Sequence, residues 1–126
     1  MGENNENHGA SPNLHWFHLV DETEHDSKGL SVGQLRIPVG HSLAQHCHAQ
    51  QEIYYIPTGR AQRLAVGETE KNLKPGHTVF IPQDALHGLK SVGNGPFALL
   101  WIFPTDSWSE INCKSQKQTK KRYLCN

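Results

Sequence analysis

Apolar and polar positions alternate in short runs along the chain from Gly29 onward, and Gly or Pro interrupts the runs at short intervals. Runs of this kind are typical of β-strands, whereas no segment after residue 20 carries an apolar stripe at helical spacing. The interruptions are turn signals, at Pro38-Val39-Gly40, Pro57-Thr58-Gly59, Lys74-Pro75-Gly76 and Gly93-Asn94-Gly95-Pro96. We expect strands over residues 30–37, 42–48, 52–57, 61–67, 70–73, 78–82, 86–91 and 96–103. Many short strands at this spacing predict an all-β sandwich or barrel.

The 126 residues suffice for one domain with one hydrophobic core. Residues 1–13 are polar and predict a disordered N-terminal segment, and residues 14–20 form the first ordered element. We therefore expect a single domain over 14–111, followed by a polar, basic tail over 112–126. No apolar stretch is long enough to span a bilayer, and the polar, acidic start does not resemble a signal peptide. The expected compartment is the cytoplasm.

The net charge of zero conceals an uneven distribution. Five of the 12 basic residues lie in 114–126, which hold no acidic residue, so 7 basic residues face 12 acidic ones in 1–113, a balance of −5. An acidic body disfavours nucleic acid as a partner, and we expect neither nucleic acid nor a membrane. The basic tail is interpreted as a solvated end. Three cysteines without a CxxC pair are consistent with a reducing compartment, and the sequence leaves open whether Cys113 and Cys125 pair.

Histidines carry the clearest chemical signal. His46 and His48 are two residues apart in an expected strand, so their side chains point to the same face. By the same parity Cys47 points away from them, and Glu52 shares a face with Tyr54. A later strand of a barrel can bring His87 beside these residues. Imidazoles with one carboxylate suit Fe(II), Mn(II), Ni(II), Co(II) or Zn(II), and such a set leaves coordination positions open. His15 and His18 are expected on the surface.

Two motifs resemble those of the cupins. The first is Gly40-x5-His46-x-His48-x3-Glu52-x6-Gly59, complete at each defining position, and the second is Gly76-x5-Pro82-x4-His87. Asp84 and Ser91 depart from the second motif, where a Gly and an Asn are usual, and we expect the change at Asp84 to alter a turn. The resemblance implies a single small jelly-roll-like β-barrel with flexible termini. It also implies one divalent metal ion per chain, bound by His46, His48, Glu52 and His87, and a homodimer.

A finer resemblance concerns the reaction. Glu52-Ile53-Tyr54 and Trp101-Ile102-Phe103-Pro104-Thr105-Asp106 look like segments of the small cupin lyases that cleave dimethylsulfoniopropionate (DMSP) to dimethyl sulfide and acrylate. The resemblance implies a metal-dependent carbon–sulfur lyase acting on DMSP or a similar small carboxylate by β-elimination. It implies Tyr54 as the base, although a packed barrel aromatic is the alternative for this residue.

Aromatic side chains are candidates for holding the sulfonium by cation–π contact, namely Trp101, Phe103 and Trp108. The alternative for the segment from Trp101 to Phe103 is a core strand, with Pro104-Thr105-Asp106 as its closing turn. Cys47 and Leu100 stand where lyases of this kind often carry Tyr, which predicts that two polar groups are missing from the site. Other cupin functions therefore stay open: a dioxygenase, a sugar isomerase or a non-enzymatic protein that binds small molecules.

Overall fold

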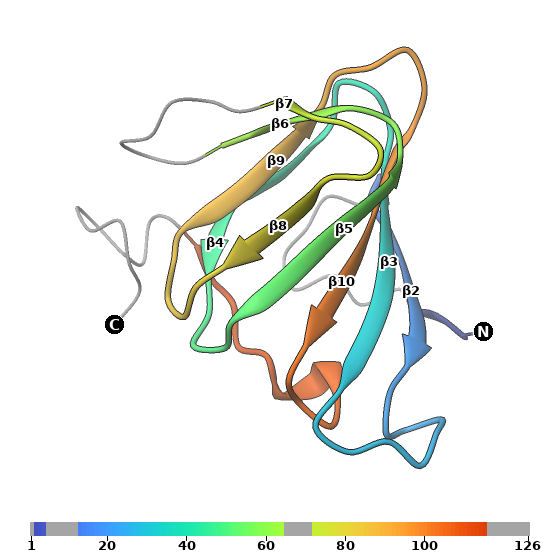
Figure 1. The fold of residues 1–126 in the computed structure, drawn as a ribbon, viewed down its shortest axis with the longest axis vertical. Helices are drawn as coiled ribbons and strands as arrows, with labels where there is room; N and C mark the ends of the chain where they lie inside the picture. The colour runs from blue at the N-terminus through green and yellow to red at the C-terminus, as the bar shows by residue number, and fades with distance from the viewer. Residues whose placement is uncertain (1, 5–12, 65–71, 116–126) are drawn as a thin grey trace.

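Two antiparallel β-sheets face each other (Figure 1). The structure is a computed structural model that describes residues 2–4, 13–64 and 72–115. The six-stranded sheet has the order β1 (Gly2–Asn4), β2 (His15–Val20), β3 (Ser31–Ile37), β10 (Phe97–Phe103), β5 (Glu52–Thr58) and β8 (Thr78–Ile81). The five-stranded sheet has the order β11 (Lys114–Ser115), β4 (Ser42–Cys47), β9 (His87–Ser91), β6 (Ala61–Arg63) and β7 (Asn72–Leu73). A 3₁₀-helix, η1 (Trp108–Glu110), follows β10.

The all-β jelly-roll expectation is confirmed, and most strands lie where the alternation predicts them. Three segments differ from the expectation, and one of them is Lys114–Ser115, which lies in the expected tail and pairs with β4. Gly2–Asn4, assigned to the disordered segment 1–13, pairs with β2 in the register Gly2↔His18, because an edge strand offers unpaired backbone groups. The strand expected over 61–67 ends at Arg63, and residues 65–71 lie outside the described residues. Most of the expected tail, residues 116–126 with Cys125, also lies outside them; Cys113 is a free thiol.

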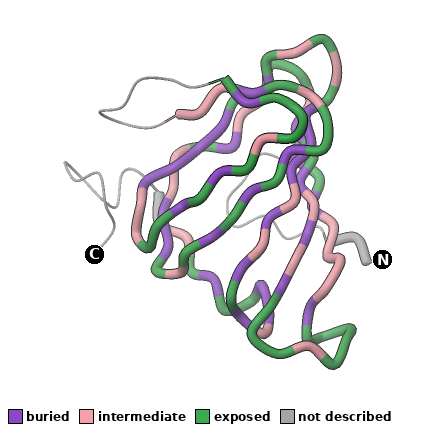
Figure 2. The backbone as a smooth tube through the Cα atoms, in the orientation of Figure 1, coloured by how far each residue is buried: buried purple, intermediate pink, exposed green. Residues whose placement is uncertain are grey.

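Strand parity divides the side chains between the core and the outer faces. Along β5, Glu52, Tyr54 and Ile56 are buried, whereas Ile53 and Tyr55 are exposed (Figure 2). The same alternation holds along β3 and β8. The inward side chains form one hydrophobic core, whose largest fully buried apolar members are Trp101, Phe97, Leu35, Ile37, Ile56, Ile81, Leu89, Leu99 and Ile111. Their removal from water is the main driving force of the fold.

The indole of Trp101 packs over the backbone of Gly33, its partner across β10 and β3. A Cβ atom at residue 33 would fall among the ring atoms of Trp101. Glycine is therefore required at residue 33 because of the close approach of the ring, and not because of its backbone dihedral angles.

In the turn before β9, a residue other than glycine adopts the left-handed backbone conformation. Asp84 has φ of 63° and donates its backbone N–H to the carbonyl oxygen of His48, with an N···O distance of 2.9 Å. Aspartate tolerates the left-handed region better than most residues, so Asp84 can take this conformation in place of glycine. The turn thus ties the segment before His87 to His48.

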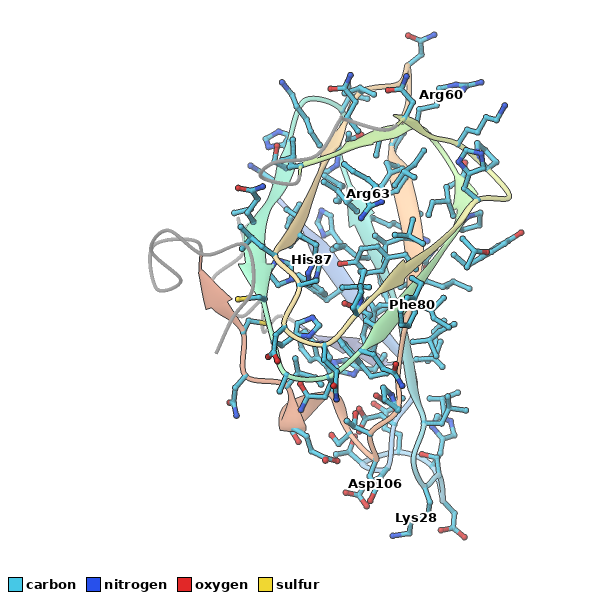
Figure 3. All side chains as sticks on the ribbon, turned by 60° about the vertical axis from the view of Figure 1, so that its left-hand side comes forward. Lys28, Arg60, Arg63, Phe80, His87 and Asp106 are labelled. Atoms are coloured by element: carbon cyan, nitrogen blue, oxygen red, sulfur yellow. The ribbon has the colours of Figure 1, made fainter. Side chains whose placement is uncertain are left out.

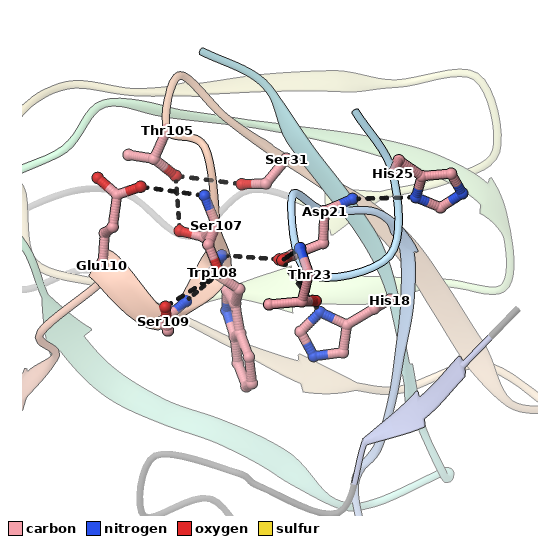
Figure 4. A network of polar contacts seen from close by, with 10 residues as sticks. All are labelled: His18, Asp21, Thr23, His25, Ser31, Thr105, Ser107, Trp108, Ser109 and Glu110. Carbon is pink, nitrogen blue, oxygen red and sulfur yellow. Dashed lines mark hydrogen bonds and ion pairs between the residues drawn. The ribbon is translucent and has the colours of Figure 1, made fainter. Parts of the chain in front are cut away.

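A network of hydrogen bonds fixes η1 against the end of the six-stranded sheet (Figure 4). The carboxylate of Asp21 accepts from Trp108 N at 2.9 Å, and also from the backbone N–H and hydroxyl of Thr23. Ser107 and Glu110 form a capping box at the start of η1. These bonds hold Trp108 against the core.

Among the residues that the structure describes, no helix has the length and apolar character needed to cross a membrane.

Candidate metal centre

Three histidines converge on the inner face of the five-stranded sheet. His46 in β4 and His87 in β9 are direct partners in the register, and their ring centroids are 4.2 Å apart. His48 follows β4, and its ring centroid is 4.9 Å from that of His87. One nitrogen from each ring lies within 4.8 Å of the others, a spacing that one metal ion can bridge. The sequence expectation that a later strand brings His87 beside the first two histidines is therefore confirmed.

Each of the three rings is oriented by its Nδ1 atom. The Nδ1 atoms of His46 and His87 lie 2.8 Å from the carbonyl oxygens of Ala44 and Ala85, and His48 Nδ1 lies 2.9 Å from that of Gln50. A carbonyl oxygen only accepts a hydrogen bond, so each Nδ1 carries the proton and donates it. Every Nε2 then lacks a proton and carries a lone pair, which is the arrangement of metal-binding histidines.

Glu52 places a carboxylate against two of these lone pairs. Its Oε1 atom lies 3.1 Å from His48 Nε2 and 3.4 Å from His87 Nε2. Burial raises the pKa of Glu52, but the contacts with His48 and His87 outweigh it, and the pKa is lowered from its ordinary value. An ionised carboxylate beside an imidazole lone pair is repulsive unless a proton or a metal ion carries positive charge between them.

The Nε2 atom of His87 is the clearest sign that a metal ion fits this site. This atom is buried and has no hydrogen-bond partner, since its 3.4 Å contact with Glu52 does not have the geometry of a hydrogen bond. Burial lowers the pKa of His46 to about 3, and the neighbouring His87 adds to the shift. His46 is therefore neutral near pH 7 and available as a ligand. The donor set of imidazole nitrogens with one carboxylate fits a divalent transition metal.

Tyr54 lies beside the histidines on the inner face of β5. Its side chain is 3% exposed, and its ring centroid is 6.1 Å from that of His87. Burial raises the pKa of Tyr54 well above 10, and the Glu52 carboxylate and the Cys113 thiol add to the shift, whereas Arg63 lowers it. A phenolate at Tyr54 near neutral pH consequently needs a further cation close by.

The three aromatic candidates form a series of ring contacts that begins at His48. Phe103 is in contact with His48, at a centroid separation of 5.2 Å. Trp101 packs on Phe103 at a centroid separation of 5.8 Å, and Trp108 stacks on Trp101 at 5.6 Å. All three are buried in the core.

Three sequence expectations about neighbouring positions have clear outcomes. Cys47 is buried in a small cluster with Leu86, separate from the main core, as its parity predicts. Leu100 pairs with the exposed Tyr55 on the outer face of the sheet, so its departure from Tyr removes no group from the inner face. His15 is exposed as expected, but the expectation for His18 is wrong, because its ring packs edge-on against Trp101 and Trp108.

Two side chains near Tyr54 were not singled out from the sequence. Arg63 and Cys113 act on the pKa of Tyr54, and burial, to which the Glu52 carboxylate adds, raises the pKa of the Cys113 thiol to about 12. Neither residue belongs to a spaced motif. The sequence signal for Arg63 is its position in the strand expected over residues 61–67, where alternation places its side chain on the inner face.

Comparison with known proteins gives a family match. Residues 33–103 match the family model described as "Cupin domain". The chain is 36% identical over 72 residues to an uncharacterized protein of Methanocaldococcus jannaschii, a match that covers 56% of each chain. It is 31% identical over 80 residues to the dimethylsulfoniopropionate lyase DddQ of Ruegeria pomeroyi, covering 64% of this chain and 39% of the lyase. The matches thus span about half the length of these curated relatives or less.

Solved structures share the fold at low sequence identity. The polyketide cyclase RemF from Streptomyces resistomycificus superposes with a TM-score of 0.78 at 15% identity, over 97% of this chain and 84% of that chain. The DMSP lyase DddQ from Ruegeria pomeroyi superposes with a TM-score of 0.70 at 23% identity, over 83% of this chain and 56% of that chain. At these identities the superpositions establish the fold alone.

Proposed function

The chain belongs to the cupin family, and we propose that within it the chain is a metal-dependent carbon–sulfur lyase acting on DMSP or a similar small carboxylate. The observation that carries the proposal is the buried, unpartnered His87 Nε2 facing the Glu52 carboxylate, with Tyr54 beside it. The sequence similarity to DddQ supports the choice of substrate class.

We assign the metal ligands to His46, His48, Glu52 and His87. The Nδ1–H hydrogen bonds to backbone carbonyls support this assignment, because they hold the three Nε2 lone pairs toward one point. A divalent transition metal ion bound there would supply a Lewis acid for the substrate carboxylate. The donor set accepts Fe(II), Mn(II), Ni(II), Co(II) or Zn(II).

Tyr54 is the proposed general base. Its phenolate oxygen removes the proton from the carbon next to the carboxylate, and the electron pair of that C–H bond forms the new C=C bond. The bond between the β-carbon and sulfur breaks, and its electron pair leaves with sulfur as neutral dimethyl sulfide, so no acid is needed for the leaving group. The products are acrylate and dimethyl sulfide, and the proton remains on Tyr54.

Phe103, with Trp101 and Trp108 behind it, is the proposed aromatic wall for the sulfonium. The contact between Phe103 and His48 supports this placement, because it puts an aromatic ring beside a proposed ligand. The interaction with an aromatic ring stabilises a cation by about 0.5–2 kcal/mol, depending on how fully the cation is removed from water.

The test is headspace dimethyl sulfide from purified protein. The protein is stripped of metal, reloaded in parallel with the five metals named above, checked for occupancy and mixed with DMSP. Sulfide from a loaded form but not from the stripped protein supports the lyase. No sulfide from any occupied form overturns it and directs the search to oxygen uptake, sugar isomerisation or ligand binding without turnover.

A homodimer is part of the proposal. The outer face of the edge strand β8 exposes Phe80, which is 57% exposed, opposite Ile53 of β5. Apolar side chains on an edge strand favour contact with a second copy of the chain. Sedimentation velocity of wild type and Phe80→Lys tests it: a dimer that the substitution dissociates supports the interface, and a monomeric wild type contradicts it.

A further inference from the structure

Arg63 is a cation on the inner face of the barrel. It is the last residue of β6, and its register partner in β9 is Leu89, which is 2% exposed in the core. Ala61, two residues earlier, is fully buried on the same face, whereas Gln62 pairs with the exposed Lys90. Parity therefore directs the Arg63 side chain inward. Figure 3 shows Arg63 and His87 within the frame of strands.

Arg63 has no anionic partner within the described residues. The ion pairs of this part of the chain join other side chains, and no hydrogen bond is made by the Arg63 guanidinium. The buried carboxylate of this region, Glu52, is held instead by His48 and His87. A guanidinium on the inner face, without an anionic partner among the described residues, is available to bind an anion.

The position of Arg63 also links it to the metal centre and to Tyr54. His87 is two residues from Leu89 in β9, so Arg63 is its diagonal neighbour across the strands, at roughly 7–8 Å between backbone positions. Tyr54 is likewise a neighbour of His87, at a ring-centroid distance of 6.1 Å. The half-buried side chain of Arg63, like that of His46, leaves the group in reach of solvent. A small anion bound to Arg63 would therefore lie on the inner face of the barrel, on the side of His87.

We propose that Arg63 binds the carboxylate of the substrate on the inner face of the barrel and sets the specificity for small carboxylates. This inference rests on the proposed function for its substrate class. The planar guanidinium forms two parallel hydrogen bonds with a carboxylate, which fixes the orientation of the carboxylate as well as its charge. The carbon next to the carboxylate is then held near Tyr54.

The test measures binding rather than turnover, with sodium propionate as the probe and propionamide as its neutral match. Amide chemical shifts of ¹⁵N-labelled full-length protein are followed in the metal-free and Zn(II)-loaded forms. Wild type is expected to bind propionate at least tenfold more tightly than propionamide. Arg63→Met is expected to weaken propionate binding tenfold or more, and Arg63→Lys to weaken it less. Arg60→Met, an exposed arginine in the turn before β6, is the matched control and should bind as wild type does.

Wild-type affinity for propionate in Arg63→Met, equal binding of propionamide, or no propionate binding in either wild-type form overturns the proposal. The amide spectrum reports whether each variant folds, and Arg63→Lys keeps the test valid if Arg63→Met does not. The outcome is separable from that of the lyase assay. Arg63-dependent propionate binding without dimethyl sulfide rejects the lyase alone, and dimethyl sulfide formation that Arg63→Met leaves unchanged rejects the role of Arg63 alone.

Discussion

The Nε2 atom of His87 lies 3.4 Å from Glu52 Oε1, while its Nδ1 atom lies 2.8 Å from the carbonyl oxygen of Ala85. The ring is thus held between a carbonyl, which fixes the proton on Nδ1, and a carboxylate that faces an unprotonated Nε2. This relationship is unfavourable without positive charge between the two side chains and favourable with a metal ion there. It makes the metal assignment testable at a single residue.

Replacement of His87 by Ala should remove metal binding. We expect the affinity for Zn(II) or Mn(II) to fall by about 100-fold or more, because one ligand is lost and Glu52 loses a neighbour that orients it. Metal content after equilibrium dialysis, measured by mass spectrometry, checks the result. His15→Ala, an exposed histidine, is the control. Full metal occupancy in His87→Ala would contradict the assignment.

Replacement of Tyr54 by Phe should preserve the metal and abolish most turnover. The ring stays packed on the inner face, and only the hydroxyl is removed, so we expect a loss of about 10²–10⁴-fold in kcat with DMSP. Tyr55→Phe is a close control, because Tyr55 is the next residue and faces outward. Equal activity in the two variants would show that Tyr54 is a packed aromatic only.

Replacement of Gly33 by Ala should destabilise the fold through Trp101. The new methyl group would meet the indole ring, and the core must shift to admit it, at a cost of about 1–3 kcal/mol. Gly95→Ala is the control, because nothing lies within 4 Å of the Cβ position there. Urea unfolding followed by tryptophan fluorescence measures both, and an unchanged midpoint in Gly33→Ala would be inconsistent with the close packing of Trp101.

The ionisation of Asp21 should make the free energy of unfolding depend on pH. Burial raises the pKa of Asp21, but hydrogen bonds from Trp108 N and Thr23 outweigh it, and the pKa is lowered. The ionised carboxylate therefore contributes stability that is fully present above the unfolded pKa of about 3.9 and is lost as pH falls through the lower folded value.

Asp21→Asn should lower the free energy of unfolding at pH 7 by about 1–3 kcal/mol, since Asn cannot replace every accepted bond. The difference from wild type should shrink below pH 4. Thermal unfolding at several pH values checks this, with the exposed Asp26→Asn as control. A difference that stays constant down to pH 2 would exclude the charge of Asp21 as its cause.

Asp84 should respond to substitution through its backbone. Asp84→Ala places a residue less suited to φ of 63° in the turn, whereas Asp84→Gly does not. We expect the Ala variant to be less stable than the Gly variant by about 1–2 kcal/mol, as measured by urea midpoints. Equal stabilities would indicate that the turn relaxes to another conformation.

Local periodicity was enough to predict much of this protein. The alternation along residues 52–56 predicts that Glu52 and Tyr54 share the inner face, and the two-residue spacing of His46 and His48 predicts their common direction. These relationships depend only on the pleat of a strand, so neighbouring residues in the sequence determine them. The aromatic segment from Trp101 to Phe103 likewise alternates inward and outward, and the side of Leu100 follows from the same rule once the strand is placed.

Tertiary structure decided the relationships between strands that are distant in the sequence. The pairing of β4 with β9 places His87 against His46, and the pairing of β9 with β6 brings the unpaired charge of Arg63 to the same inner face. Neither follows from a local pattern, because register and bulges depend on which strands become neighbours and on how the core fills the space between the sheets. The sequence by itself determined which residue types can form a metal site and which way they face. Only the packing of the two sheets decided that Glu52 would meet two of the histidines, and only strand pairing decided that Arg63 would be a diagonal neighbour of His87.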